Sequence, residues 1–468
     1  MNNNPYKKLV SNSIVFTIAN LGSKILSFIM VPFYTYVLST EEYGTVDIMT
    51  TLNSLLLPII FLSMSDAVLR YAMDKRYDKK TVLTTAFYVY ICSILFLGCL
   101  LPVVAWFYPQ ISKYLLLFAL LFICNGVMQV LNQFLRASDH VKAFAINGVL
   151  YTFAFAGLNI IFLVKIRLGI FGYLYSIILA DIACIVFASV VSRVWNYIAL
   201  KPSLRMTKIM LRYSIPLIPN ALMWWIMDAS DKFVITYFLG VSANGLYAIS
   251  KKLPTLIDTF HSIFNQAWQI SAIQENEEPD SKEFTSEIYK VYFIFLFLVV
   301  NFLMIIARPL VIYILSDAYE MTWKYIPFLL VSVTFSSLSG FLSSKLIASE
   351  QTKQIFKTTI IGAAVNTALN FILIPGMGIN GAGLATMMGF AVVLFIRERL
   401  LKKRHEIEVQ FNRPLLFIFT GIQIIAYYAL PLWKSVVVMT VLFCGLLFIL
   451  RKFIIRFIKT TMSKIIKK

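Results

Sequence analysis

Seven cationic side chains interrupt segments of the chain that are otherwise apolar: Lys24, Arg70, Lys232, Lys251, Lys252, Arg308 and Lys345. A charge at the centre of a membrane-spanning helix costs about 2.5–3.5 kcal/mol on insertion scales, so such residues usually face water or an opposite charge. A cavity of positive potential suits an anionic ligand such as a phosphate or pyrophosphate headgroup. Two alternatives stay open, because Arg308 and Lys345 are within reach of a headgroup layer and Arg70 is spaced to pair with Asp66 one helical turn earlier.

Three carboxylates in apolar segments are candidates for coupling to an ion gradient: Asp228, Asp231 and Asp258. A carboxylate in a dry cavity exchanges protons readily, or coordinates sodium. Structural pairing with the neighbouring lysines is the alternative. The sequence has only three histidines and shows neither metal-ligand spacing nor a nucleophile motif, so we expect no enzyme and no cofactor beyond a coupled H⁺ or Na⁺.

The composition is that of a membrane protein, with 59% hydrophobic and 14% charged residues. Runs of about 20 apolar residues are long enough to span a bilayer, and in lipid such runs must be helical. Fourteen runs lie near 11–37, 44–68, 82–104, 114–135, 143–164, 170–192, 214–238, 243–270, 289–315, 325–347, 357–375, 380–396, 414–431 and 435–455. They predict an all-α polytopic membrane protein with about 14 transmembrane helices.

The lysines and arginines between these runs predict the orientation. Most of them fall on the side that carries both termini, whereas the opposite side has only Lys113, Lys165, Arg167, Lys324 and Lys434. Basic loops favour the cytoplasm, so both termini are expected there, and the first residues show no cleavable signal peptide. Basic loops beside anionic lipids also explain most of the net charge of +19, so nucleic-acid binding is not expected.

Short words recur in the same order at offsets of 201 to 211 residues. Thr35-Tyr36 with Gly44 recurs as Thr236-Tyr237 with Gly245, Ala137-Ser138 as Ala348-Ser349, Asn159 as Asn370, and Gly169-Ile170 as Gly378-Ile379. The displacement equals six spans, an even number, so the halves should be parallel-related six-helix bundles. We predict an N-lobe over 1–203, a C-lobe over 204–406, and two further helices with a basic tail over 407–468.

Prolines within the spans mark candidate hinges. Pro32 and Pro254 lie inside predicted spans, where proline removes a helical hydrogen bond and clashes with the preceding turn. Kinks of this kind are tolerated in membranes. Pro216, Pro219 and Pro327 are weaker candidates; Pro216 and Pro219 open a span, and proline in a first helical turn is harmless.

Several longer words resemble one transporter family. They are Ser23-Lys24, Leu38-Ser-Thr-Glu-Glu-Tyr-Gly44, Tyr213-Ser-Ile-Pro-Leu-Ile-Pro219, Asp231-Lys232, Gly245-Leu-Tyr-Ala-Ile-Ser-Lys251, Asn366, Asn370, Pro375 and Gly378-Ile-Asn-Gly-Ala382. Together they resemble the polysaccharide-biosynthesis flippases, the Wzx group, of the superfamily that also holds the MATE exporters and the lipid II flippase MurJ. The resemblance covers nearly the whole chain.

The resemblance implies a flippase of the bacterial cytoplasmic membrane with a cationic central cavity. It implies that undecaprenyl-pyrophosphate-linked oligosaccharide moves to the outer leaflet by ion-coupled alternating access, beside membrane lipids and a polysaccharide polymerase or assembly machinery. A MATE-type exporter of cationic drugs is the first alternative, and would favour acids over lysines in its cavity. A membrane polysaccharide polymerase or ligase is the second, although the chain lacks a sizeable external loop for catalytic residues.

Overall fold

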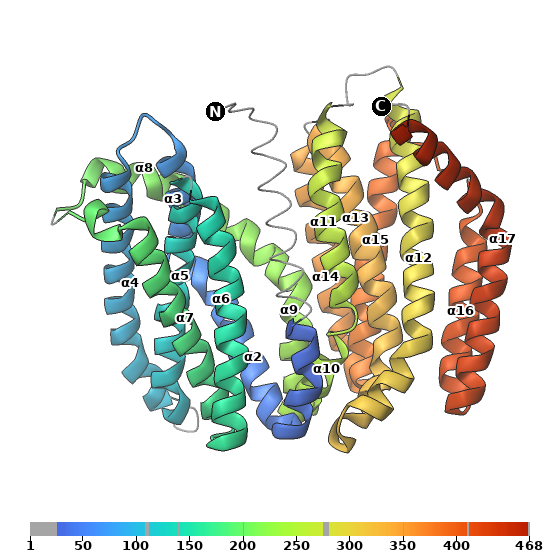
Figure 1. The fold of residues 1–468 in the computed structure, drawn as a ribbon, viewed down its shortest axis with the longest axis horizontal. Helices are drawn as coiled ribbons and strands as arrows, with labels where there is room; N and C mark the ends of the chain where they lie inside the picture. Colours follow the sequence, from blue (N-terminus) through green and yellow to red (C-terminus); the bar gives the residue numbers. More distant parts are fainter. Residues whose placement is uncertain are drawn as a thin grey trace. The chain divides into compact units, whose positions relative to one another are not determined.

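The described part of the chain is helical. The computed structural model describes residues 26–466, except 108–111, 139, 200, 275–279, 350 and 410. It contains no β-strand within those ranges. The helices form two compact units, Met1–Ala248 and Ile249–Lys468, which are described separately (Figure 1). The predicted all-α fold class is confirmed.

The first unit is a bundle of long apolar helices with a short amphipathic helix packed against it. An apolar helix over Leu26–Val37 comes first. It is followed by α2 (Thr40–Ile60), α3 (Met64–Met73), α4 (Lys79–Phe107), α5 (Ser112–Ala137), α6 (Val141–Asn159) with a π-helical extension (Ile160–Lys165), α7 (Ile170–Ser192), α8 (Leu204–Ser214), α9 (Leu217–Leu239) and α10 (Val241–Ser250). The amphipathic α8 buries Met206 and Met210 and exposes Arg205 and Arg212, so this basic segment is a helix and not a simple loop.

The second unit packs its helices around α13, the most deeply buried of the candidate membrane spans. Its elements are α11 (Thr255–Gln274), α12 (Ser281–Ile314), a 3₁₀ segment (Asp317–Tyr325), α13 (Ile326–Ala348), α14 (Thr352–Met377), α15 (Ile379–Lys403), α16 (Arg413–Ala429) and α17 (Leu432–Ile466). The last two helices form a pair that packs against α12 (Figure 1).

The membrane character of the chain is confirmed. Ten helices among the described residues are long and apolar enough to cross a membrane. The other four predicted spans coincide with the shorter apolar helices Leu26–Val37 and Arg413–Ala429, with α9, and with the α10–α11 pair. The count of fourteen crossings stays a prediction.

Two predicted spans are not continuous helices, so the prediction of one helix over each was wrong. The run 44–68 breaks between α2 and α3, where Leu62 and Ser63 have φ of 53° and 48°. The run 243–270 breaks between α10 and α11, in a turn that contains Pro254. Proline explains the second break, whereas neither glycine nor proline occupies the first.

The repeated words occupy equivalent places in the two halves of the chain. Ala137 ends α5 and Ala348 ends α13, while Gly169 and Gly378 cap α7 and α15 with φ of 53° and 62°. Glycine suits both caps because positive φ is strained for other residues. The lobes 1–203, 204–406 and 407–468 stay a prediction. The compact units divide later, between Ala248 and Ile249, because α9 packs on α2.

A buried arginine ties three helices of the second unit together. The Arg397 guanidinium on α15 is 2% exposed and donates to carbonyl oxygens of Ser339 and Ile355 and to hydroxyls of Ser343, Thr358 and Thr359. Every one of these acceptors is uncharged. The planar fork of arginine is therefore what holds α13, α14 and α15 in one geometry.

We expect Arg397→Lys to lower the free energy of unfolding by about 2–3 kcal/mol or more, because an ammonium cannot reach acceptors on both sides and each charged hydrogen bond contributes about 1.5–3 kcal/mol. Thermal unfolding of the purified protein in detergent measures the change. The matched control is Arg399→Lys, an exposed arginine on the same helix, which should leave the midpoint unchanged. Equal unfolding midpoints for the two variants would contradict the role of Arg397 in holding the three helices together.

Candidate functional site

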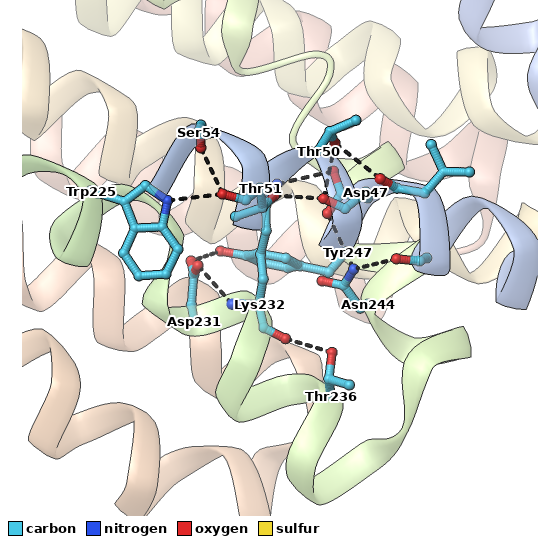
Figure 2. Close-up of polar contacts among 12 residues, drawn as sticks. Asp47, Thr50, Thr51, Ser54, Trp225, Asp231, Lys232, Thr236, Asn244 and Tyr247 are labelled. Carbon is cyan, nitrogen blue, oxygen red and sulfur yellow. Dashed lines mark hydrogen bonds and ion pairs between the residues drawn. The ribbon is translucent and has the colours of Figure 1, made fainter. Parts of the chain in front are cut away.

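A network of charged and polar side chains joins α2 to α9 and α10 inside the first unit (Figure 2). The Lys232 ammonium on α9 lies 3.0 Å from Asp47 Oδ1 and donates to Thr51 Oγ1 at 3.1 Å. Both charged side chains are 16% exposed. Their mutual neutralisation explains how a lysine and an aspartate are tolerated in apolar segments.

The close approach of α2 and α10 depends on two glycines. A methyl group on Gly44 would lie 2.2 Å from the Val241 carbonyl oxygen, and one on Gly245 would lie 2.0 Å from that of Thr40. With both glycines in place, Asn244 Nδ2 donates to the Gly44 carbonyl and to Asp47 Oδ2, each at 3.2 Å. These glycines are one of the repeated pairs, so equivalent positions of the repeat meet here.

Asp231 and Trp225 extend the network along α9. The Tyr247 hydroxyl donates to Asp231 Oδ2, and the Lys232 backbone N–H donates to Asp231 Oδ1 at 2.9 Å (Figure 2). Trp225 Nε1 donates to the Thr51 carbonyl at 3.2 Å. Asp231 is 1% exposed, and its carboxylate is solvated by these donors in place of water.

A separate cavity of about 490 Å³ lies between α2, α3, α4, α5 and α6 of the first unit. Five carboxamides line it: Asn53, Asn125, Gln129, Asn132 and Gln133. We call it the carboxamide cavity. Asp66 is the one charged residue among the described residues that line it, and none of them is Lys or Arg. Its volume lies within the range of about 300–1,000 Å³ that is typical of small-molecule sites.

The break between α2 and α3 shapes one wall of this cavity. Phe61 stacks on Tyr90 with ring centroids 4.0 Å apart, and it packs so tightly on Gly126 that a methyl group there would lie 2.3 Å from the ring. The chain then turns through Leu62 and Ser63 with positive φ before α3 begins. Strained backbone of this kind persists only where surrounding packing enforces it, and it is enriched at functional sites.

A buried acid lies next to the cavity. Asp181 on α7 is fully buried, and neither carboxylate oxygen has a hydrogen-bond partner among the described residues. The Asn125 side chain is within interaction range of this carboxyl group, although no hydrogen bond of ordinary geometry joins them. Tyr151 on α6, Cys124 on α5 and Cys184 on α7 itself are within electrostatic range. An isolated buried carboxyl group of this kind can take up and release a proton.

The predicted cations do not form one cluster within the second unit. Arg308 stacks 4.0 Å from the Trp323 ring centroid and donates to the carbonyls of Tyr427 and Leu430. Lys345 is 2% exposed and donates to Ser281 Oγ at 2.8 Å. Ser281 and Arg308 are at opposite parts of α12, roughly 40 Å apart at about 1.5 Å per residue. Arg308 and Lys345 therefore cannot contact one phosphate group together.

The remaining predicted cations have different surroundings. Lys24 lies outside the described residues. Arg70 is exposed on α3 and makes no ion pair with the equally exposed Asp66 in the described structure. Lys251 and Lys252 lie in the turn between α10 and α11, and both are half-buried. Lys232 forms an ion pair with Asp47, which neutralises its charge.

The coupling and hinge candidates are also dispersed. Asp228 belongs to α9, but its side chain is outside the described part of the structure, whereas Asp258 is exposed in the first turn of α11. Pro254 lies in the α10–α11 turn, where a hinge is expected to lie. Pro32 lies within the helix over Leu26–Val37. A role for any of these residues stays a prediction.

Sequence reasoning missed the carboxamide cavity because its lining is uncharged. The signal was present, since Asn125, Gln129, Asn132 and Gln133 recur at spacings of three and four in an apolar segment and so share one helix face. Asp181 was visible as an ionisable residue in a span, but the sequence alone did not show that it lacks a partner.

The fold is shared with known transporters. The chain superposes on the lipid II flippase MurJ in an inward closed conformation with a TM-score of 0.71 at 14% identity, covering 94% of this chain and 100% of that one. An inward-facing MATE-family multidrug transporter of the MOP superfamily gives a TM-score of 0.64 at 15% identity, covering 83% and 98%. The chain therefore shares its fold with these membrane transporters.

Sequence comparison defines the family. Residues 35–324 match the family described as polysaccharide biosynthesis protein, and the chain belongs to it. Residues 269–466 match the family of the lipid II flippase MurJ. A relative called Lsg locus putative protein 1, from Haemophilus influenzae, is 22% identical over 402 residues, which is 80% of this chain and 95% of that protein.

Replacing Asp47 alone with alanine should lower the free energy of unfolding by about 3 kcal/mol, because it leaves the Lys232 ammonium without a counter-charge. The double variant Asp47→Ala with Lys232→Met should recover part of this loss, with a coupling of about 1–3 kcal/mol. Thermal unfolding of the single and double variants in detergent completes the cycle. If the losses in free energy of unfolding were strictly additive, Asp47 and Lys232 would not stabilise each other.

Proposed function

We propose that this protein is a flippase for undecaprenyl-pyrophosphate-linked oligosaccharide. It moves the repeat unit from the cytoplasmic to the outer leaflet of the bacterial cytoplasmic membrane for surface polysaccharide synthesis. The observation that carries the proposal is a large polar cavity inside a helical bundle of membrane-spanning character, in a chain that belongs to a polysaccharide biosynthesis family. Such a cavity can shield hydroxyl-rich sugars from lipid while they cross.

The proposed orientation places both termini in the cytoplasm, as the lysine and arginine distribution predicts. The carboxamide cavity then lies in the cytoplasmic half of the first unit, since Gln129 to Gln133 approach the cytoplasmic end of α5 and Phe144 follows the start of α6. That half is where a lipid-linked precursor made in the cytoplasm would enter.

Pyrophosphate binding is assigned in this proposal to the predicted cations other than Lys232. Lys24, Arg70, Lys251 and Lys252 keep that role, together with Arg308 or Lys345 at their separate levels. Lys232 is the weakest member of the set, because its charge is already matched by Asp47. A polysaccharide polymerase or assembly machinery is the expected partner on the far side of the membrane.

The proposed energy source is a proton or sodium gradient. Asp231 and Asp258 remain coupling candidates with Asp228, but Asp181 has the stronger supporting geometry, because its carboxyl group is buried without a hydrogen-bond partner in the described structure. Uptake of one proton removes the cost of burying its charge. Protonation and release would thus favour different packings of α7 against α5 and α6.

A MATE-type exporter of cationic drugs is the second candidate function. One specific observation favours it, because Asp66 is the charged residue that lines the carboxamide cavity and no lysine or arginine accompanies it there among the described residues. The polymerase or ligase alternative has no such observation in its support.

Depleting the protein from cells should separate the two candidates. We expect lipid-linked oligosaccharide to accumulate on the cytoplasmic leaflet, with surface polysaccharide lost and synthesis of the repeat unit intact. Leaflet-specific labelling of the glycan measures this. Normal surface polysaccharide with new sensitivity to cationic dyes would reject the flippase and favour the drug exporter.

Asp181→Asn should abolish coupling, because an amide cannot release a proton, while the neutral side chain fits the same buried space. Transport in proteoliposomes should fall at least about tenfold and lose its dependence on pH, with thermal stability retained. Imposed proton and sodium gradients, applied separately, identify the ion. The matched control is Asp74→Asn, whose carboxylate is paired with Arg76 on the exterior. If the Asp181→Asn variant transported at the wild-type rate with the wild-type pH dependence, Asp181 would have no part in coupling.

A further inference from the structure

We infer that the carboxamide cavity binds the sugar portion of the transported lipid and leaves the pyrophosphate to other residues. The inference rests on the proposed function and specifies which part of the substrate this cavity takes. The ligand class is a neutral, hydroxyl-rich pyranose.

The lining has the hydrogen-bonding capacity that sugar hydroxyls require. A hydroxyl both donates and accepts, and a carboxamide offers two N–H donors and a carbonyl acceptor on one side chain. Asn53 on α2 and Gln129 on α5 contribute such groups from two of the cavity's walls. Asp66 on α3 adds a carboxylate, which accepts from hydroxyls and cannot accept from a phosphate.

The charge of the lining argues against the phosphate as its occupant. Anionic oxygens are recognised by guanidinium and ammonium groups, and the described lining residues include neither; the neighbouring Arg136 guanidinium is engaged by Gln133 Oε1 and the Phe144 ring. The one formal charge, on Asp66, would repel a pyrophosphate. The cavity would thus take the neutral sugar, and the predicted cations would take the anionic pyrophosphate.

Aromatic rings supply the apolar part of a sugar site. Tyr90 and Phe144 line the cavity together with Phe61, and stacked packing on Phe122 holds the Phe61 ring at a centroid distance of 4.9 Å. A pyranose presents C–H groups on one face and hydroxyls around its edge. The Phe61 ring is stacked between Tyr90 and Phe122, so the half-buried Phe144 is the aromatic residue to which the C–H face is assigned, and the amides match the hydroxyls.

Two further features indicate that a ligand belongs here. Asn53 Oδ1 is buried without a hydrogen-bond partner, although its amide nitrogen donates to Asn125 Oδ1 at 3.4 Å. Buried polar atoms normally have partners, so an unsatisfied acceptor at a cavity wall is a ready contact for a ligand hydroxyl. The positive-φ turn at Leu62 and Ser63 lies in the same wall, where backbone strain is retained.

The test compares two lipid probes on the full-length protein in nanodiscs. One probe is undecaprenyl pyrophosphate, and the other is the same lipid carrying one N-acetylglucosamine. Asn53→Leu and Gln129→Met remove amides at nearly constant volume. Each should weaken binding of the sugar-bearing lipid by about tenfold, the equivalent of one or two lost hydrogen bonds, and should change binding of the sugar-free lipid less than about twofold.

Two controls make the outcomes distinct. Asn159→Leu removes another buried asparagine of the first unit whose Oδ1 is also unpaired but which does not line the cavity, and it should leave both affinities unchanged. Gln129 is exposed to the cavity, so Gln129→Met should not unfold the bundle even where Asn53→Leu does.

The inference is overturned where the cavity variants weaken both lipids equally or neither of them, while the wild type binds both. Failure of the wild type to bind either lipid would instead reject the proposed function. A third outcome would favour the drug-exporter alternative. In that case Gln129→Met and Asp66→Asn would weaken binding of a lipophilic cationic dye and leave binding of the sugar-bearing lipid unchanged.

Discussion

The close approach of α2 and α10 at Gly44 and Gly245 is the constraint on which the first unit depends. A side chain at either position would collide with the backbone of the facing helix. Because the helices touch, Asn244 reaches Asp47, and the same carboxylate accepts from Lys232 on α9. In lipid no water is present to solvate the Asp47 carboxylate and the Lys232 ammonium. The glycine contact therefore helps to determine whether these two charges can be buried.

The polar side chains of the first unit are divided by charge. Asp47 and Lys232 neutralise each other, and Asp231 is held by a tyrosine hydroxyl and a backbone N–H. The cavity receives mostly amides and hydroxyls. Uncharged groups cost far less to expose to a partly dry space than ions do, so an amide-lined cavity can open and close without a large desolvation penalty. That low cost would suit the proposed transport of sugars.

The sequence predicted features that depend on local chemistry. The apolar runs located the helices, and the repeated words located helix ends such as Ala137 and the positive-φ caps Gly169 and Gly378. It did not predict the break at Leu62 and Ser63, because neither residue is glycine or proline; the break follows Pro58 in the last turn of α2 and lies beside the packing of Phe61 on Gly126. It also could not pair Lys232 with Asp47, since the two residues are 185 positions apart. Cations in both halves therefore suggested a cationic cavity, although at least one of those charges is satisfied by the protein.

The α10–α11 turn has the properties of a place where the chain can change conformation at low cost. Pro254 supplies no N–H donor, so one helical hydrogen bond is missing at the turn. Local bonds of the turn run from Lys252 N–H to the Ile249 carbonyl and from Thr255 Oγ1 to the Lys252 carbonyl. Hinges are short segments of this type that absorb backbone changes while packed helices move as bodies. Since Lys251 and Lys252 lie in the turn itself, any rotation there would also redirect two ammonium groups. The proposed hinge motion and the proposed presentation of charge to an anionic headgroup would then be one event.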